Sequence, residues 1–87
     1  MPNMHTHLQK IVPAKNQYRF YSVSVGQTLF GEWAVVKEWG RIGSKGGQRH
    51  TEWHASPERA FDALQVIKQK KERRGYVARP EQLSLPL

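Results

Sequence analysis

The chain has 87 residues and a mass of 10.1 kDa, which is the size of one small domain. Its composition, with 38% hydrophobic and 24% charged residues, excludes a disordered chain and favours a folded domain with a thin core. Lys and Arg number 14 against 7 Asp and Glu, so the formal net charge of +7 favours a polyanionic partner, nucleic acid first and an anionic membrane surface second. The absence of cysteine excludes disulfides and thiolate metal sites.

No apolar run approaches the ~20 residues of a membrane span, and the N-terminus lacks the apolar stretch of a secretion signal. We therefore expect a cytoplasmic protein that associates with the nucleoid and not with a membrane. Residues 1–15 are read as an N-terminal arm or an extra edge strand. A folded domain is expected over residues 16–78, and a tail over residues 79–87.

Alternating side chains predict three strands. Over residues 18–25, Tyr18 and Phe20 share one face while Tyr21, Val23 and Val25 share the other. The next segment of the chain is predicted to be a loop bounded by glycines at positions 26 and 31, which leads into the second strand.

The second strand is predicted over residues 33–39, with Trp33, Val35, Lys37 and Trp39 on one face. A glycine-rich turn over residues 43–47 follows. A third strand is predicted over residues 48–53, and it is polar enough to lie at a sheet edge.

The pattern then becomes helical. Ser56 is suited to be the N-cap, Pro57 the first helical residue, and Gly75 the residue just past the end, which gives a helix of about 18 residues. Its apolar stripe needs a sheet face to cover, so we expect an α+β fold: a small antiparallel β-meander with one C-terminal helix packed across it. The stripe consists of Ala60, Phe61, Ala63, Leu64 and Ile67.

The second strand ends on the triplet Trp39-Gly40-Arg41, followed by Ile42-Gly43 and the glycine turn. With the aromatic first strand, the Ser56-Pro57-Glu58 helix start and the Lys-rich helix end, this order resembles the WGR domain family. The resemblance covers residues 18–76. Such domains occur in DNA-dependent poly(ADP-ribose) polymerases, where they bind DNA near strand ends, and as short stand-alone bacterial proteins.

The resemblance implies that Trp39 contacts the nucleotide at a DNA terminus and that Arg41 contacts DNA or docks another domain. It implies no catalytic activity, because nothing here resembles the polymerase catalytic domain. The residues also support this independently: an indole can stack on a base or sugar, a guanidinium grips phosphate, and Gly40 lets a backbone approach. The alternative is a core Trp39, with Arg41 bound to a carboxylate or a helix end.

Further cations extend the candidate DNA site. Lys45 in the glycine turn and Arg49 on the third strand are each either phosphate contacts or solvated surface charges. At the end of the helix, the cations either bind phosphate or interact favourably with the helix C-terminus, and Tyr76 either stacks on DNA or caps the core. The candidates at the end of the helix are Lys71, Arg73, Arg74 and Tyr76.

We predict neither a metal site nor a cofactor, and no enzyme. His50 and His54 lie ~13 Å apart if extended, which is too far to share an ion. No paired carboxylates or Ser-His-Asp order stand out.

The tail Gln82-Leu83-Ser84-Leu85-Pro86-Leu87 resembles the short peptides by which bacterial polymerases and replication regulators bind the sliding clamp. In that reading Gln82 meets polar groups at the mouth of a groove, and Leu83, Leu85 and Leu87 supply apolar contacts, with Leu85 and Leu87 in its pockets. In the alternative, the leucines cover the domain's own core.

Together these features predict a non-enzymatic DNA-binding module with little sequence specificity, which recognises ends, nicks or gaps in DNA replication or repair. A second hypothesis is a protein-docking module that uses Trp39 and Arg41 as interface anchors. Binding of single-stranded RNA is a third.

Overall fold

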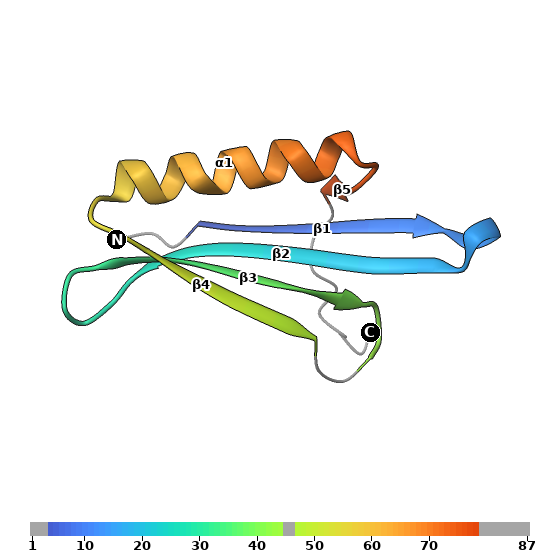
Figure 1. The fold of residues 1–87 in the computed structure, drawn as a ribbon, viewed down its shortest axis with the longest axis horizontal. Helices are drawn as coiled ribbons and strands as arrows, with labels where there is room; N and C mark the ends of the chain where they lie inside the picture. The colour runs from blue at the N-terminus through green and yellow to red at the C-terminus, as the bar shows by residue number, and fades with distance from the viewer. Residues whose placement is uncertain (1–3, 45–46, 79–87) are drawn as a thin grey trace, which may run out of the picture.

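The computed structural model describes residues 4–44 and 47–78, which form one five-stranded antiparallel sheet with a single long helix on one side (Figure 1). This arrangement confirms the predicted α+β meander with one helix packed across it. Within the described residues, no helix is long and apolar enough to span a bilayer. The elements are β1 (Met4–Val12), a short 3-10 helix η1 (Pro13–Lys15), β2 (Gln17–Gln27), β3 (Trp33–Arg41), β4 (Gln48–His54), α1 (Pro57–Arg73) and β5 (Val77–Ala78). The strand order in the sheet is β4-β3-β2-β1-β5.

β2, β3 and β4 correspond to the three strands predicted from the sequence. β2 pairs with β3 over nine residues, with Tyr21 opposite Trp39 and Val25 opposite Val35. β4 pairs with β3 alone, so the polar third strand does lie at an edge. Because paired residues of antiparallel strands share a face, the register assigns every strand residue to the helix side or to the open side.

β1 belongs to the sheet. It pairs with β2 along its whole length, and Leu8 is fully buried beneath the helix. Of the two alternatives for residues 1–15, the strand is therefore present over residues 4–12, and the sheet begins before residue 16. β5 pairs with β1 at Leu8 and Gln9, so β1 is not the outermost strand.

The helix begins and ends where its capping residues predict. The Ser56 hydroxyl accepts a hydrogen bond from the Arg59 N–H at 3.2 Å. At the other end Gly75 has φ of +96°, and the Tyr76 N–H donates to the Lys71 carbonyl. This hydrogen-bond pattern ends the helix and reverses the chain towards β5.

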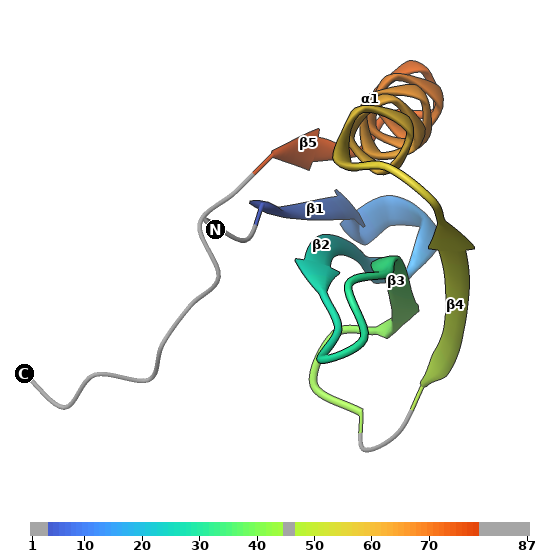
Figure 2. The ribbon, with the colours of Figure 1, turned by 90° about the vertical axis from the view of Figure 1, so that its left-hand side faces the viewer.

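The core lies between α1 and one face of the sheet (Figure 2). Of the predicted apolar stripe, Ala60 and Leu64 are buried, and Ala63 and Ile67 pack against the core. Phe61 was expected in this stripe, but its side chain is exposed. The core is small, as the chain length predicts. Its buried members are Leu8, Tyr21, Val23, Val25, Trp33, Val35, Ala60 and Leu64.

Truncating the helix side of this core should be costly. Leu64 is 1% exposed, so Leu64→Ala is expected to lower the free energy of unfolding by about 2–5 kcal/mol. Val66 on the same helix is 48% exposed, so Val66→Ala should change it by less than about 0.5 kcal/mol. Urea unfolding followed by circular dichroism measures both, and equal effects would contradict the assigned orientation of the helix.

Candidate nucleic-acid interface

The WGR triplet lies at the end of β3, where the last turn of α1 passes above it. A cavity of about 520 Å³ opens there, and we call it the basic aromatic pocket. It contains cations and aromatic rings from β2, β3 and α1 but no carboxylate side chain. Its lining residues are Arg19, Phe20, Tyr21, Trp39, Gly40, Arg41, Gln48, Lys71 and Tyr76.

The Trp39 side chain is half-buried. This degree of burial lies between the two environments expected from the sequence, a DNA-contacting surface and the core. Its indole stacks on the Tyr21 ring, with centroids 5.7 Å apart and an angle of 17° between the planes. It packs against the core cluster and also lines the pocket. The indole is therefore held rigidly by the core while part of it faces the pocket.

Arg41 is exposed and has no acidic partner in the described residues. Its Nη1 donates to the Asn16 carbonyl at 3.3 Å, and its Nη2 donates to Asn16 Oδ1 at 3.2 Å. The guanidinium also lies over the Tyr18 ring, 5.5 Å from its centroid. These contacts orient the group without neutralising its charge, so Arg41 remains able to bind an anion.

Lys71 and Tyr76 close the pocket from the helix side. The Lys71 ammonium lies 4.4 Å from the Tyr21 ring centroid and 5.4 Å from that of Tyr76. The Tyr76 ring meets Tyr21 edge-on at 6.5 Å and packs against the core. Tyr76 thus caps the core, as one of its two expected roles requires, and its ring also lines the pocket.

A second hollow of about 240 Å³ adjoins this pocket and shares Arg19, Lys71 and Tyr76 with it. It adds two further cations, Lys10 from β1 and Arg74 from the end of the helix. Together the two hollows bring five cationic side chains to one end of the sheet. They are Lys10, Arg19, Arg41, Lys71 and Arg74.

The clustering has an electrostatic consequence for Lys71. Burial lowers the pKa of its ammonium, and the neighbouring guanidinium groups of Arg74 and Arg19 lower it further. A bound phosphate would oppose both effects, because it supplies a negative charge next to the ammonium. Burial also raises the pKa of the Tyr21 hydroxyl, with the negative charge of Glu52 and the Tyr76 hydroxyl adding to the effect.

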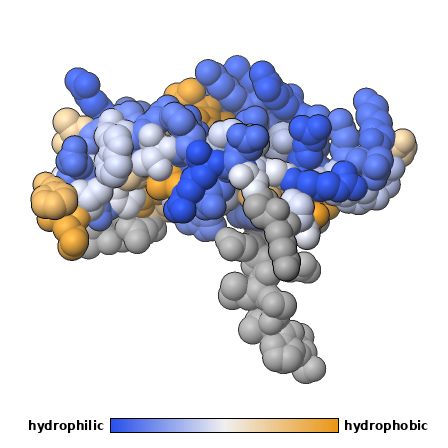
Figure 3. All heavy atoms as spheres, turned by 60° about the horizontal axis from the view of Figure 1, so that its bottom comes forward, coloured by the Kyte–Doolittle hydropathy of each residue, from blue (hydrophilic) through white to orange (hydrophobic). Residues whose placement is uncertain are grey.

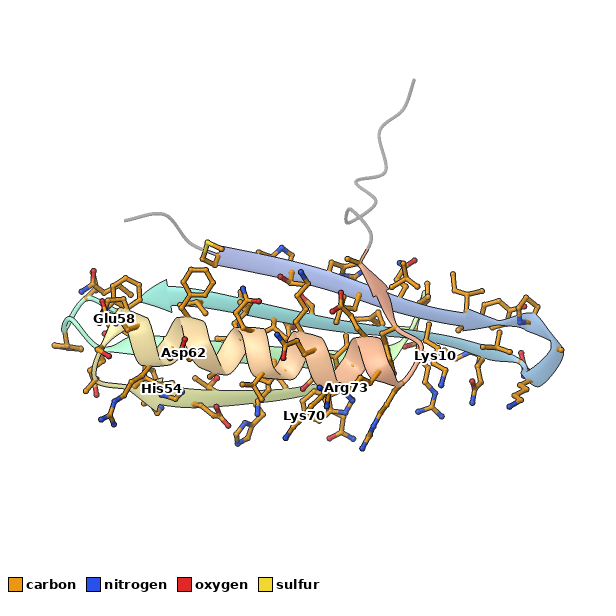
Figure 4. The ribbon with its side chains drawn as sticks, turned by 90° about the horizontal axis from the view of Figure 1, so that it is seen from above. Lys10, His54, Glu58, Asp62, Lys70 and Arg73 are labelled. Carbon is orange, nitrogen blue, oxygen red and sulfur yellow. The ribbon has the colours of Figure 1, made fainter. Side chains whose placement is uncertain are left out.

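Other candidate residues lie elsewhere. Arg49 pairs with Glu38 on the face away from the helix, and so does not extend the basic aromatic pocket as expected. Arg73 lines neither hollow; Figure 4 shows it with Lys70 on the β4 side of the helix, whereas Lys10 lies on the β1 side. Lys45 and the tail residues Gln82, Leu83, Leu85 and Leu87 lie outside the described residues.

Sequence reasoning missed Arg19 and Lys10. The signal for Arg19 was available, because it is two residues before Tyr21 and therefore shares its face of the strand. Lys10 lies on a strand whose existence the sequence left open. Within residues 4–44 and 47–78, no group of three or more His, Asp or Glu residues is arranged to hold a metal ion.

A comparison with protein families identifies the domain. The model of the WGR domain matches residues 4–82. The chain belongs to the WGR domain family. These domains are non-catalytic and serve as modules of the nucleic-acid-binding type in poly(ADP-ribose) polymerases.

An uncharacterized protein of Sinorhizobium fredii, y4dW, is 34% identical over 80 residues. The match covers 92% of this chain but 37% of that protein. The WGR chain therefore spans little more than a third of the length of this relative.

The charge of Arg74 should contribute, after burial, to the lowered pKa of Lys71. Arg74→Gln removes one of the cations that lower the pKa of Lys71, so this pKa should rise towards its usual value. NMR titration of the isotope-labelled lysine side chains measures the change. Arg73→Gln removes the neighbouring charge outside both hollows and should leave the pKa of Lys71 unchanged. Equal shifts in both variants would contradict the assigned cause.

Proposed function

We propose that this WGR protein is a non-enzymatic DNA-binding module that recognises strand ends or nicks with little sequence specificity. The observation that carries the proposal is the basic aromatic pocket, where Trp39, Lys71 and Arg41 converge from two elements. Cations bind the phosphate backbone, and an aromatic ring stacks on a sugar or base that has lost its neighbour. A terminus or nick offers both of these groups together.

The geometry of the pocket also supports the proposal of weak sequence specificity. Reading a sequence needs side chains that reach base edges in a groove, usually from an exposed helix. Here the Lys71 ammonium lies over aromatic rings at the pocket, and the face of α1 that carries Leu64 covers the sheet. The contacts available at the pocket are therefore to phosphate, sugar and an exposed base. Arg49 and Arg73 remain candidates for phosphate contacts outside the pocket, and Lys45 remains a candidate from the sequence alone.

The protein-docking alternative uses the same Trp39 and Arg41 surface to meet an acidic protein. It predicts that substitutions in the pocket weaken a protein complex while leaving DNA affinity unchanged. A comparison across DNA structures separates the two hypotheses, because an acidic protein face offers no strand end. Preference for nicked or blunt-ended duplex over a closed circular duplex supports the DNA hypothesis.

The pocket should determine DNA affinity. Lys71→Ala and Arg41→Ala are each expected to weaken binding to nicked duplex about tenfold, because each removes a phosphate contact. Trp39→Ala should weaken it by a similar factor through lost stacking. Fluorescence anisotropy with nicked, blunt-ended and circular DNA measures these affinities, and thermal unfolding checks that Trp39→Ala remains folded.

Arg59→Ala is the matched control for charge. Arg59 is exposed in the first turn of α1, at the opposite end of the helix from Lys71. Losing this cation should weaken DNA binding by much less than Lys71→Ala. If Arg59→Ala and Lys71→Ala have equal effects, binding follows net charge and the assignment of the pocket is wrong.

We further propose that the tail binds the bacterial sliding clamp and so brings this DNA-binding module to replication or repair sites at the nucleoid. Support comes from the sequence of residues 82–87 alone. Two binding sites on one chain raise occupancy through effective concentration, provided the linker spans both.

Deleting residues 82–87 should abolish capture of the purified sliding clamp, because the proposed groove contacts are lost. The affinity for nicked DNA should stay unchanged, since the deletion keeps every described residue that lines the pocket. Surface plasmon resonance with immobilised clamp and anisotropy with DNA measure the two effects. Clamp capture that survives the deletion would rule out the tail as the clamp-binding segment.

A further inference from the structure

The sheet face away from α1 has a different surface chemistry from the helix-covered face. We call it the open face; its strand residues alternate with those of the core, so Phe20, Ser22 and Ser24 project there from β2. A hollow of about 460 Å³ lies on it, and its lining includes His5, His7 and these three residues. Seen from below (Figure 3), hydrophilic residues cover most of the surface, and hydrophobic ones gather at the end that carries the β2–β3 loop.

The open face combines flat rings with hydrogen-bonding groups. The His7 imidazole stacks on the Phe20 ring, with centroids 6.1 Å apart and 13° between the planes. Ser22 Oγ and His5 Nε2 form a hydrogen bond at 2.7 Å. Trp53, opposite Ala34 in the register, presents a 59% exposed ring on the same face. Rings beside small polar groups are typical of sheets that stack and hydrogen-bond unpaired bases.

The charges on this face are few and nearly balanced. Among the described strand residues that project there, Glu38 is the single carboxylate. It lies opposite Arg49 in the pairing of β3 and β4, so a cation offsets its charge. A strand of DNA therefore meets little electrostatic repulsion on this face of a chain whose net charge is +7.

The open face is continuous with the basic aromatic pocket. Phe20 lines both hollows. Its ring lies against Gly40, where a Cβ would be 3.3 Å from Phe20 Cε1, so the glycine of the triplet lets the ring occupy this position. From Gly40 to Ala34, opposite Trp53, β3 spans ~20 Å at about 3.3 Å per residue. A few unpaired nucleotides would cover this length.

We propose that the open face binds the unpaired strand of DNA that continues from an end held in the basic aromatic pocket. This inference rests on the proposed function. The bases stack first on the Phe20 and His7 rings and then on Trp53, while Ser22 and Ser24 offer hydrogen bonds. The protein then distinguishes a DNA end with an overhang from a blunt end.

The test compares the full chain on a blunt duplex and on the same duplex with an overhang of about six nucleotides, within the size range of single-strand binding sites. The overhang should bind about tenfold more tightly. Trp53→Ala removes a stacking ring, and Ser24→Glu places a carboxylate in the centre of the face. Each should abolish the gain from the overhang while leaving affinity for the blunt duplex unchanged.

Phe61→Ala is the matched control, because it removes an exposed ring from α1 on the other side of the sheet. It should preserve the gain. No gain from the overhang, or a gain that survives both Trp53→Ala and Ser24→Glu, would overturn the proposal and favour a protein partner for this face. The proposed end-binding function is tested separately, by the response of the blunt duplex to Lys71→Ala.

Discussion

The contacts of one ring, that of Tyr21, connect the core of this domain to its candidate binding site. Tyr21 is buried with the core of β2, stacks on Trp39, meets Tyr76 edge-on and carries the Lys71 ammonium over its face. A thin core leaves few ways to hold a binding side chain rigidly. Here the same packing that stabilises the sheet against the helix also positions an indole, a second tyrosine and an ammonium group around one cavity.

Much of the fold could be predicted because local rules and tertiary contacts agree. Alternation in β2 and β3 identified which residues share a face, and Ser56 and Gly75 marked the limits of the helix. β1 was ambiguous because only Leu8 among its residues is fully buried, while polar residues surround it and Pro13 follows. Its place in the sheet depends on pairing with β2 and on the helix above, which no local pattern reports.

The candidate site was predictable where it follows the triplet and uncertain where it depends on three-dimensional convergence. Trp39 and Arg41 share a face because they are two residues apart on a strand. Lys10 and Arg19 join them only because a hairpin and the end of the helix meet there. Arg49 lies on the other face because Glu38 is its partner in the register, and the sequence of a glycine-rich turn does not fix that register.

The orientation of Arg41 depends on the hairpin between β1 and β2, distant from it in the sequence. Asn16 takes a left-handed conformation there, with φ of 54°, and presents both its backbone carbonyl and its side-chain oxygen to the guanidinium. Asparagine tolerates this conformation better than most residues. Related chains that differ in this turn would therefore aim the same arginine differently, so ligand preference within the family can diverge while the three-residue signature stays intact.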